Sequence, residues 1–278
     1  MAKTEMETLA YGYGLIEGPR VDSGDALYFS DVTRGGVYRR DPTGEVTVVI
    51  PKRRGVGGIA LHADGGLVVS GRNICHVRDG VTRIVFECDA LGFNDLMTDD
   101  QGRVLCGTIR TDPFGGEATR TAGEAYRIEL DGSVTELYGG VSLTNGIGFS
   151  PDGGQVYHSD TTSGHVICHD VDGDRLVNRR ALAPAGAFHP DGLAVDAEGT
   201  IWVADFEAGC VRGLETTGHQ VAQIDVPSTA VTSLCFGGAD GRDLYVVTAD
   251  NRDDPSRGGT IFRTRVDVAG LPVALAAV

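Results

Sequence analysis

The sequence predicts an all-β fold, a six-bladed β-propeller. One phrase recurs six times along the 278 residues, turn dipeptides accompany the copies, and no long amphipathic helix stands between them. The 41 glycines and 10 prolines suit many short strands joined by tight turns. We expect residues 1–278 to form a single propeller domain.

Each copy of the recurring phrase is typical of two antiparallel strands joined by a tight turn. A small or acidic residue and an apolar pair precede Asp-Gly or a related turn pair, and an alternating apolar strand follows. The copies begin near residues 18, 58, 94, 145, 191 and 232, so their separations are 40, 36, 51, 46 and 41 residues. This spacing matches the period of propeller blades. Later strand-like runs, such as 164–168 and 176–182, complete four-stranded units.

Two segments fall outside the repeat. One separation is long because residues 110–123 are inserted, and we expect a loop there rather than a second domain. The run Thr8–Gly12 stands before the first copy, and we expect it to pair into the last blade and close the ring. A sandwich or jelly roll also contains many short strands, but it would not repeat one phrase six times.

The composition argues against several kinds of partner. Lys and Arg number 24 against 39 Asp and Glu, a net charge of −15. Because such a protein repels phosphates and anionic lipids, we expect neither nucleic acid nor a membrane as partner. No apolar run reaches the ~18 residues of a membrane span, and no signal peptide opens the chain. The six cysteines lack CxxC spacing and lie in apolar runs, so we expect a reduced, cytoplasmic protein of undetermined oligomeric state.

Carboxylate and carboxamide side chains stand where four of the six phrases begin. Because the first strand of each propeller blade lines the central channel, residues at this position meet around one axis. They are Glu17, Gly58, Asn94, Asn145, Asp191 and Thr232. The carboxylates among them would repel one another, and a hard divalent cation would resolve this. Oxygen ligands favour Ca²⁺, Mg²⁺ or Mn²⁺, and Zn²⁺ also accepts carboxylates.

Each of these residues also has a structural explanation, as a strand start or half of a turn dipeptide. Their shared place in the repeat favours a metal site at the mouth of the channel. In the third copy, either Asn94 or Asp95 could point inward. The seven histidines show no metal-binding spacing and are interpreted as structural, and GxSxG, Walker and Rossmann motifs are absent.

Longer motifs at these positions resemble a known family. They are EGP at 17–19, FND at 93–95, LTNGIGFSPDG at 143–153, PDGLAVDAEGTIWVA at 190–204 and TSLCFGG at 232–238. They are similar to the gluconolactonase, regucalcin (senescence marker protein) and luciferin-regenerating enzyme group over nearly the whole chain. The resemblance implies a metal-dependent lactonase in which Glu17, Asn145 and Asp191 bind one divalent ion. Calcium is the first candidate for that ion, and zinc, manganese and magnesium are the others. It also implies that Asn94 and Asp112 contact substrate.

One position departs from the pattern of sugar lactonases. Similar members often carry arginine two residues before the Asn94 position, and this chain has Gly92 there. Either Arg110 from the inserted loop supplies the missing cation, or the substrate is less polar than an aldonolactone.

We therefore expect hydrolysis of a lactone or related cyclic ester. The metal would polarise the carbonyl and acidify a bound water, with Asp191 as general base and Asn94 orienting the substrate or the water. Two alternatives keep the same site: a Ca²⁺-binding regulatory propeller without catalysis, and a different reaction on the same metal.

Overall fold

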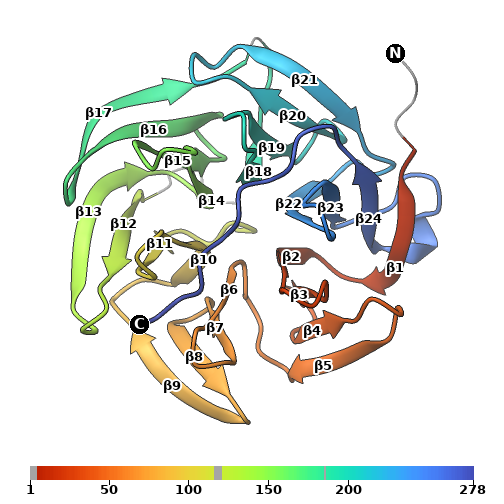
Figure 1. Ribbon diagram of the computed structural model, residues 1–278, viewed down its shortest axis with the longest axis horizontal. Coiled ribbons are helices and arrows are strands. Elements are labelled where there is room, and N and C mark those ends of the chain that lie inside the picture. Colours follow the sequence, from red (N-terminus) through yellow and green to blue (C-terminus); the bar gives the residue numbers. More distant parts are fainter. Residues whose placement is uncertain (1–4, 116–120, 185) are drawn as a thin grey trace.

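A computed structural model of the chain describes residues 5–115, 121–184 and 186–278. Its strands form six four-stranded antiparallel sheets around a central axis, so the predicted six-bladed propeller is confirmed (Figure 1). Blade 1 consists of β2 (Ile16–Val21), β3 (Leu27–Asp31), β4 (Val37–Arg40) and β5 (Val46–Ile50). Blade 2 consists of β6 (Ile59–Leu61), β7 (Leu67–Val69), β8 (Ile74–Arg78) and β9 (Val81–Phe86). Blade 3 consists of β10 (Gly92–Thr98), β11 (Val104–Ile109), β12 (Gly123–Ile128) and β13 (Val134–Val141). Blades 4 and 5 consist of β14 (Thr144–Phe149), β15 (Gln155–Asp160), β16 (His165–Asp172) and β17 (Arg175–Leu182), then β18 (Pro190–Val195), β19 (Ile201–Asp205), β20 (Cys210–Leu214) and β21 (Gln220–Asp225).

The sixth blade closes the ring by joining the first strand of the chain to the last three strands. It contains β22 (Val231–Gly237), β23 (Asp243–Thr248), β24 (Gly259–Arg265) and the N-terminal strand β1 (Glu7–Tyr13). Strand β1 pairs antiparallel with β24, and the guanidinium of Arg263 donates two hydrogen bonds to the carboxylate of Glu7. The expectation that Thr8–Gly12 pairs into the last blade is therefore confirmed.

The inserted segment forms a connection, as expected. Strand β11 ends at Ile109 and β12 begins at Gly123, so Gly123 belongs to the strand rather than to the loop. Residues 116–120 of the insertion lie outside the described residues. In the described chain the one helical element is a short 3₁₀ turn, η1 (Pro255–Arg257), and no helix there is long and apolar enough to cross a membrane.

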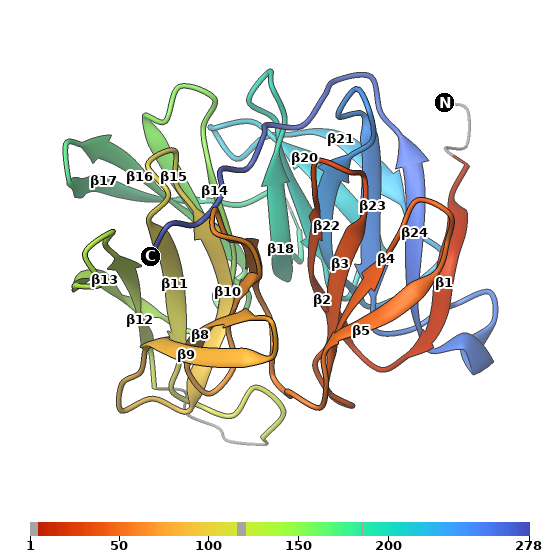
Figure 2. The ribbon, with the colours of Figure 1, turned by 60° about the horizontal axis from the view of Figure 1, so that its bottom comes forward.

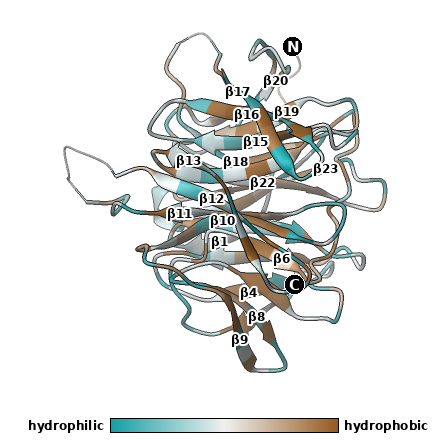
Figure 3. Ribbon diagram, turned by 90° about the vertical axis from the view of Figure 1, so that its left-hand side faces the viewer, coloured by the Kyte–Doolittle hydropathy of each residue, from teal (hydrophilic) through white to brown (hydrophobic). Residues whose placement is uncertain are grey.

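Apolar side chains pack between neighbouring blades. One such cluster joins blades 1 and 6 through Ile16, Phe29, Tyr245 and Ile261, all at most 4% exposed. Burying an aliphatic or aromatic side chain of this size contributes about 1.5–3 kcal/mol. Figure 3 shows hydrophobic stretches along the strands and hydrophilic residues in many of the connecting loops.

The cysteines follow the expected pattern. Cys88 is half-buried and the other five are buried, and all six are free thiols.

Four inner strands share an irregularity near their starts. The pairing register shifts between Glu17 and Arg20 in β2, Phe93 and Leu96 in β10, Thr144 and Ile147 in β14, and Pro190 and Leu193 in β18. A bulge of this kind re-aims side chains and leaves backbone groups unpaired in the sheet. The repeated sequence phrase therefore produces a repeated distortion, located at the predicted site residues.

A segment that the repeat did not predict crosses one face of the propeller. Residues 266–278 run from β24 over the central axis toward β10 (Figures 1 and 2). The segment bonds to blade 5 through Leu271 N–H and Val195 O (2.9 Å), and to blade 2 through Ala276 N–H and Leu61 O (2.8 Å). We call residues 266–278 the C-terminal strap.

Candidate metal centre

The three predicted metal ligands occupy equivalent places in the structure. Glu17, Asn145 and Asp191 are each the second residue of an inner strand, in β2, β14 and β18. Their exposed fractions are 6%, 6% and 5%. Burial raises the pKa of Glu17 well above its ordinary value, and the nearby carboxylate of Asp191 raises it further. The fold therefore places two carboxylates close together away from bulk water.

Asp191 has an unused acceptor in this site. Within the described residues its Oδ1 is buried and has no hydrogen-bond partner. Burial, followed by the charge of Asp95, raises the pKa of Asp191 well above its ordinary value. A buried carboxylate oxygen without a donor is costly, so this atom fits a cation ligand.

A chain of hydrogen bonds orients the amide of Asn145. Its Nδ2 donates to Thr161 Oγ1 (2.9 Å), and that hydroxyl donates to Pro190 O (2.6 Å). Its Oδ1 accepts from Asn94 Nδ2 (2.9 Å), which also donates to Thr144 O (2.8 Å). The Asn145 oxygen keeps a second lone pair, as a hard cation requires. Asn94 is thus joined to the predicted ligand set, with its own Oδ1 left as an acceptor.

The starting positions of blades 2 and 6 have structural roles. A Cβ at Gly57 would lie 2.0 Å from Asn94 Oδ1, and one at Gly58 would lie 2.8 Å from Asp95 Oδ1. These glycines leave room for the side chains of blade 3. Thr232 Oγ1 donates to Ile16 O (2.5 Å) and so joins blade 6 to blade 1.

Two charged residues that the sequence analysis did not assign complete the channel. Asp95 is 5% exposed, and Arg20 is 6% exposed. The register shift after Phe93 brings both Asn94 and Asp95 into the site, so the two residues are not alternatives. The signal for Arg20 was a second charged residue, after Glu17, within the six residues of β2. Together with Glu17 and Asp191, and with every carboxylate ionised, these groups have a formal charge of three negative and one positive.

The donor set suits a hard divalent cation. The excess of two negative charges in the channel matches one such ion. Among the described residues, no group of three or more His, Cys, Asp or Glu side chains is placed to hold a metal. A metal held by the two carboxylates therefore needs the Asn145 amide oxygen or water as a further ligand. All of these donors are oxygens, which favours calcium, magnesium or manganese.

The predicted substrate residue Arg110 is engaged elsewhere. Its Nε donates to both carboxylate oxygens of Glu124 (3.1 and 3.0 Å), and its Nη1 donates to Asp89 O. It lines a cavity of about 370 Å³ with Arg72, Asp89, Ala90 and Leu91. In the described part of the chain it forms no hydrogen bond or ion pair with the three predicted ligands.

Asp112 and Gly92 also have defined surroundings. Asp112 is exposed, and its Oδ1 accepts from Phe114 N–H (2.9 Å). The structure does not join it to the ligand set by a hydrogen bond, so its contact with substrate stays a prediction. A Cβ at Gly92 would lie 2.8 Å from Gly71 O, so the backbone after β7 leaves too little space for a side chain at this position.

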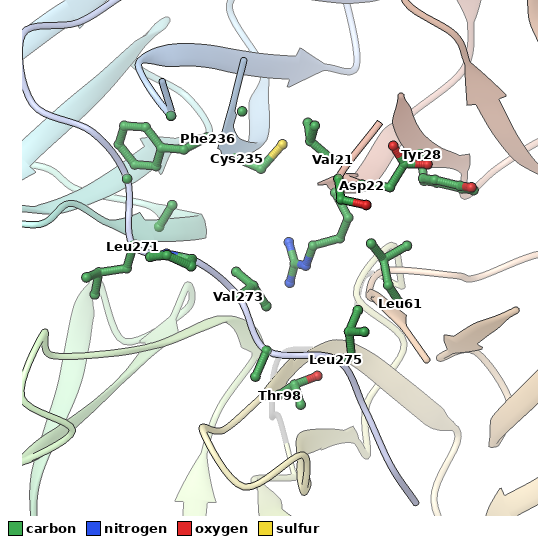
Figure 4. A pocket seen from close by; sticks show the side chains of 18 of the residues that line it. Val21, Asp22, Tyr28, Leu61, Thr98, Cys235, Phe236, Leu271, Val273 and Leu275 are labelled. Carbon is green, nitrogen blue, oxygen red and sulfur yellow. The ribbon is translucent and has the colours of Figure 1, made fainter. Parts of the chain in front are cut away.

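A larger cavity of about 800 Å³ lies at the opposite mouth of the channel, under the C-terminal strap. Val21, Leu61, Phe236, Val273 and Leu275 are among its mostly apolar lining (Figure 4). The predicted ligands are at the other ends of the inner strands and do not line it. The larger cavity and the buried oxygen ligands therefore lie at different ends of the channel. The candidate metal site is at the end with the buried oxygen ligands.

Comparison with known proteins places the chain in a family. The family model described as "SMP-30/Gluconolactonase/LRE-like region" matches residues 15–250. The chain belongs to this family. One SMP-30/gluconolactonase/LRE-like relative, the pentonolactonase XacC of Haloferax volcanii, is 32% identical over 266 residues, 88% of each chain. A 6-deoxy-6-sulfogluconolactonase of Pseudomonas putida is 31% identical over 263 residues, 88% of each chain. Regucalcin of Xenopus laevis is 30% identical over 270 residues, 90% of each chain.

Solved structures agree with this SMP-30/gluconolactonase/LRE-like assignment. A luciferin-regenerating enzyme superposes with a TM-score of 0.87 at 25% identity, covering 99% of this chain and 100% of its own. A calcium-binding protein of Agrobacterium tumefaciens, a regucalcin, superposes with a TM-score of 0.84 at 24% identity over 99% of each chain. The predicted family resemblance and fold are confirmed.

Proposed function

We propose that the protein is a metal-dependent hydrolase that opens a lactone ring. The observation that carries the proposal is the set of buried oxygens from Glu17, Asn145 and Asp191, which includes an unpartnered carboxylate oxygen. The names of two relatives, a pentonolactonase and a sulfogluconolactonase, support the reaction class. A calcium-binding regucalcin among the structural neighbours supports calcium as the metal. Magnesium, manganese and zinc are the other candidates.

The chain's own residues take distinct roles in this proposal. A bound divalent cation would supply Lewis-acid stabilisation of the carbonyl oxygen and acidify water. Asp191 would accept the proton of the attacking water at the carboxylate oxygen that does not bind the cation. Asn94 uses both Nδ2 hydrogens within the protein, so its Oδ1 orients a donor, either the water or a substrate hydroxyl.

Activity measured with and without metal tests this function. A panel of γ- and δ-lactones, followed by proton release, should show hydrolysis that a chelator abolishes and added metal restores. Asp191→Asn should lower kcat by about 10²–10³-fold, since it removes an electrostatic and proton-accepting group. Elemental analysis should find one divalent ion in the wild type and less in Glu17→Gln. Metal binding without hydrolysis of any lactone would instead indicate a regulatory calcium-binding propeller.

The proposed substrate is a lactone with fewer hydroxyls than an aldonolactone. The Gly92 position has no cation and no room for one, and Arg110 is held by Glu124 and Asp89. Hydroxyls that enter without partners cost about 1–3 kcal/mol each, so alkyl lactones should rival gluconolactone in kcat/KM. Arg110→Ala is the informative variant, because Gly92→Arg would meet the backbone. A strong wild-type preference for gluconolactone that Arg110→Ala removes would show that Arg110 supplies the cation.

A further inference from the structure

A buried ion pair lies beside the candidate metal site and has no role in the proposed reaction. Arg20 of β2 and Asp95 of β10 are both more than nine-tenths buried, and their Nη2 and Oδ1 atoms are 3.8 Å apart. Arg20 also donates to Leu96 O (3.0 Å) and Pro19 O (2.8 Å). Asp95 Oδ1 accepts from Leu96 N–H (2.7 Å), and the carboxylate accepts a further backbone hydrogen bond from Ile147. The pair thus links blades 1, 3 and 4 across the channel.

The position of Arg20 separates the two ends of the channel. It follows Glu17 by three residues in β2, and its side chain lines the 800 Å³ cavity at the opposite mouth. The guanidinium therefore lies between the carboxylates of the candidate site and the largely apolar far mouth. Its charge acts on those carboxylates through a medium with little water, where Coulomb interactions are strong.

The geometry is poor for a pair whose purpose is stability. The separation of 3.8 Å is long, and within the described residues Arg20 Nε is buried without a partner. Well-packed apolar residues in place of a buried ion pair are often neutral or stabilising. A role in setting the charge of the channel explains why two charged residues are buried here in a geometry that contributes little to stability.

Each member of the pair sets the charge available to a metal. With both present and the three carboxylates ionised, as binding of a cation requires, the four buried groups have a formal net charge of −2, which one divalent ion neutralises. Loss of the Asp95 charge would leave −1, and loss of the Arg20 charge would leave −3. Removal of both would return the channel to −2.

We propose that Arg20 and Asp95 are positioning residues that hold the channel at a net charge of −2 and so match the site to a divalent cation. The inference rests on the proposed metal site. The pair touches neither the substrate nor the reacting atoms, and it acts through Glu17 and Asp191.

A double-mutant cycle tests the inference by metal binding rather than by activity. Calorimetric titrations at pH 8 with Ca²⁺ and with Tb³⁺ compare the wild type, Asp95→Asn, Arg20→Met and the double variant. Asp95→Asn should weaken Ca²⁺ binding roughly 10- to 100-fold, and adding Arg20→Met should recover most of that loss. Arg20→Met alone should raise the ratio of Tb³⁺ to Ca²⁺ affinity at least about tenfold, because a trivalent ion matches −3.

Two further variants separate charge from packing. Arg20→Lys keeps the positive charge and should keep the wild-type affinity ratio. Asp99→Asn removes one partner of the buried Asp99–Arg103 pair (2.6 Å), at the far end of blade 3, and should change neither affinity. If Asp95→Asn does not fold, the Tb³⁺ to Ca²⁺ ratio of Arg20→Met decides the question.

The outcomes distinguish this inference from the proposed function. Unchanged affinities in the variants, or a double variant weaker than Asp95→Asn, would overturn the charge-matching role and leave the metal site in place. A wild type that binds no divalent ion would overturn both.

Discussion

His158 forms buried hydrogen bonds behind the candidate metal site. Its Nε2 pairs with Thr144 Oγ1 (2.6 Å) and its Nδ1 with the Tyr138 hydroxyl (2.7 Å). Thr144 directly precedes the predicted ligand Asn145, so this chain of side chains holds the start of β14. Burial lowers the pKa of His158 to about 3.

This depressed pKa predicts acid sensitivity. Between pH 6.5 and about 3, His158 is protonated in the unfolded chain but neutral in the folded protein. The free energy of unfolding therefore falls as the pH falls, by about 1.4 kcal/mol per pH unit. His158→Gln should be less stable than the wild type at pH 7, and this gap should narrow by about 2–3 kcal/mol by pH 4.5. Urea unfolding across this pH range measures it. His189→Gln, at a more exposed site, is the control, and a constant gap for His158→Gln would contradict the prediction.

The C-terminal strap is an element that covers one mouth of the channel and is fixed there by several contacts. Ala276 is fully buried, its N–H donates to Leu61 O and its carbonyl accepts from Ala63 N–H (both 2.8 Å). Arg83 Nη2 donates to Val278 O (2.8 Å). These contacts hold the strap over the mouth opposite to the metal site.

Removal of residues 275–278 should therefore separate stability from function. The loss of these hydrogen bonds and of buried Ala276 should lower the free energy of unfolding by about 2–4 kcal/mol. Because the candidate ligands lie at the other mouth, kcat/KM of the folded variant should stay within about twofold. Denaturant unfolding and lactone assays on the same preparation measure both. A large fall in kcat/KM with unchanged stability would show that the far mouth takes part in the reaction.

The candidate metal site joins distant parts of the whole molecule. Glu17 belongs to blade 1, Asn145 to blade 4 and Asp191 to blade 5, so one ion would link three blades. Without the ion, the carboxylates repel one another in a buried site. The folded ring should therefore be more stable with metal than without it.

Calorimetric melting of the whole protein tests this coupling. Calcium at about 100 times its Kd should add ~2.7 kcal/mol and raise the Tm by roughly 5–10 °C. Asp191→Asn should lose this shift. Its metal-free form should melt at a higher temperature than the metal-free wild type, because one of the two carboxylates that repel each other is gone. Asp112→Asn, which removes an exposed carboxylate, should keep the shift. Equal shifts in all three proteins would exclude Asp191 as a ligand.

The sequence by itself determined the blade count and the position of the site within each blade. Turn pairs, strand alternation and the repeat period are local properties, and they are readable without knowledge of the neighbours. Because every blade has the same internal geometry, equal places in the phrase become equal places around the axis. The repeat alone therefore suffices to group Glu17, Asn94, Asn145 and Asp191, and the family resemblance selected the three predicted ligands among them.

Only the tertiary structure decided which further residues join that group. Asp95 enters the channel beside Asn94 because the bulge in β10 alters the alternation of the strand. Arg20 pairs with Asp95, which lies two blades away and 75 positions along the chain. The C-terminal strap lies outside the repeated phrase, so the sequence period did not predict it. In each case the deciding interaction is between segments distant in sequence, and a local pattern carries no information about such a contact.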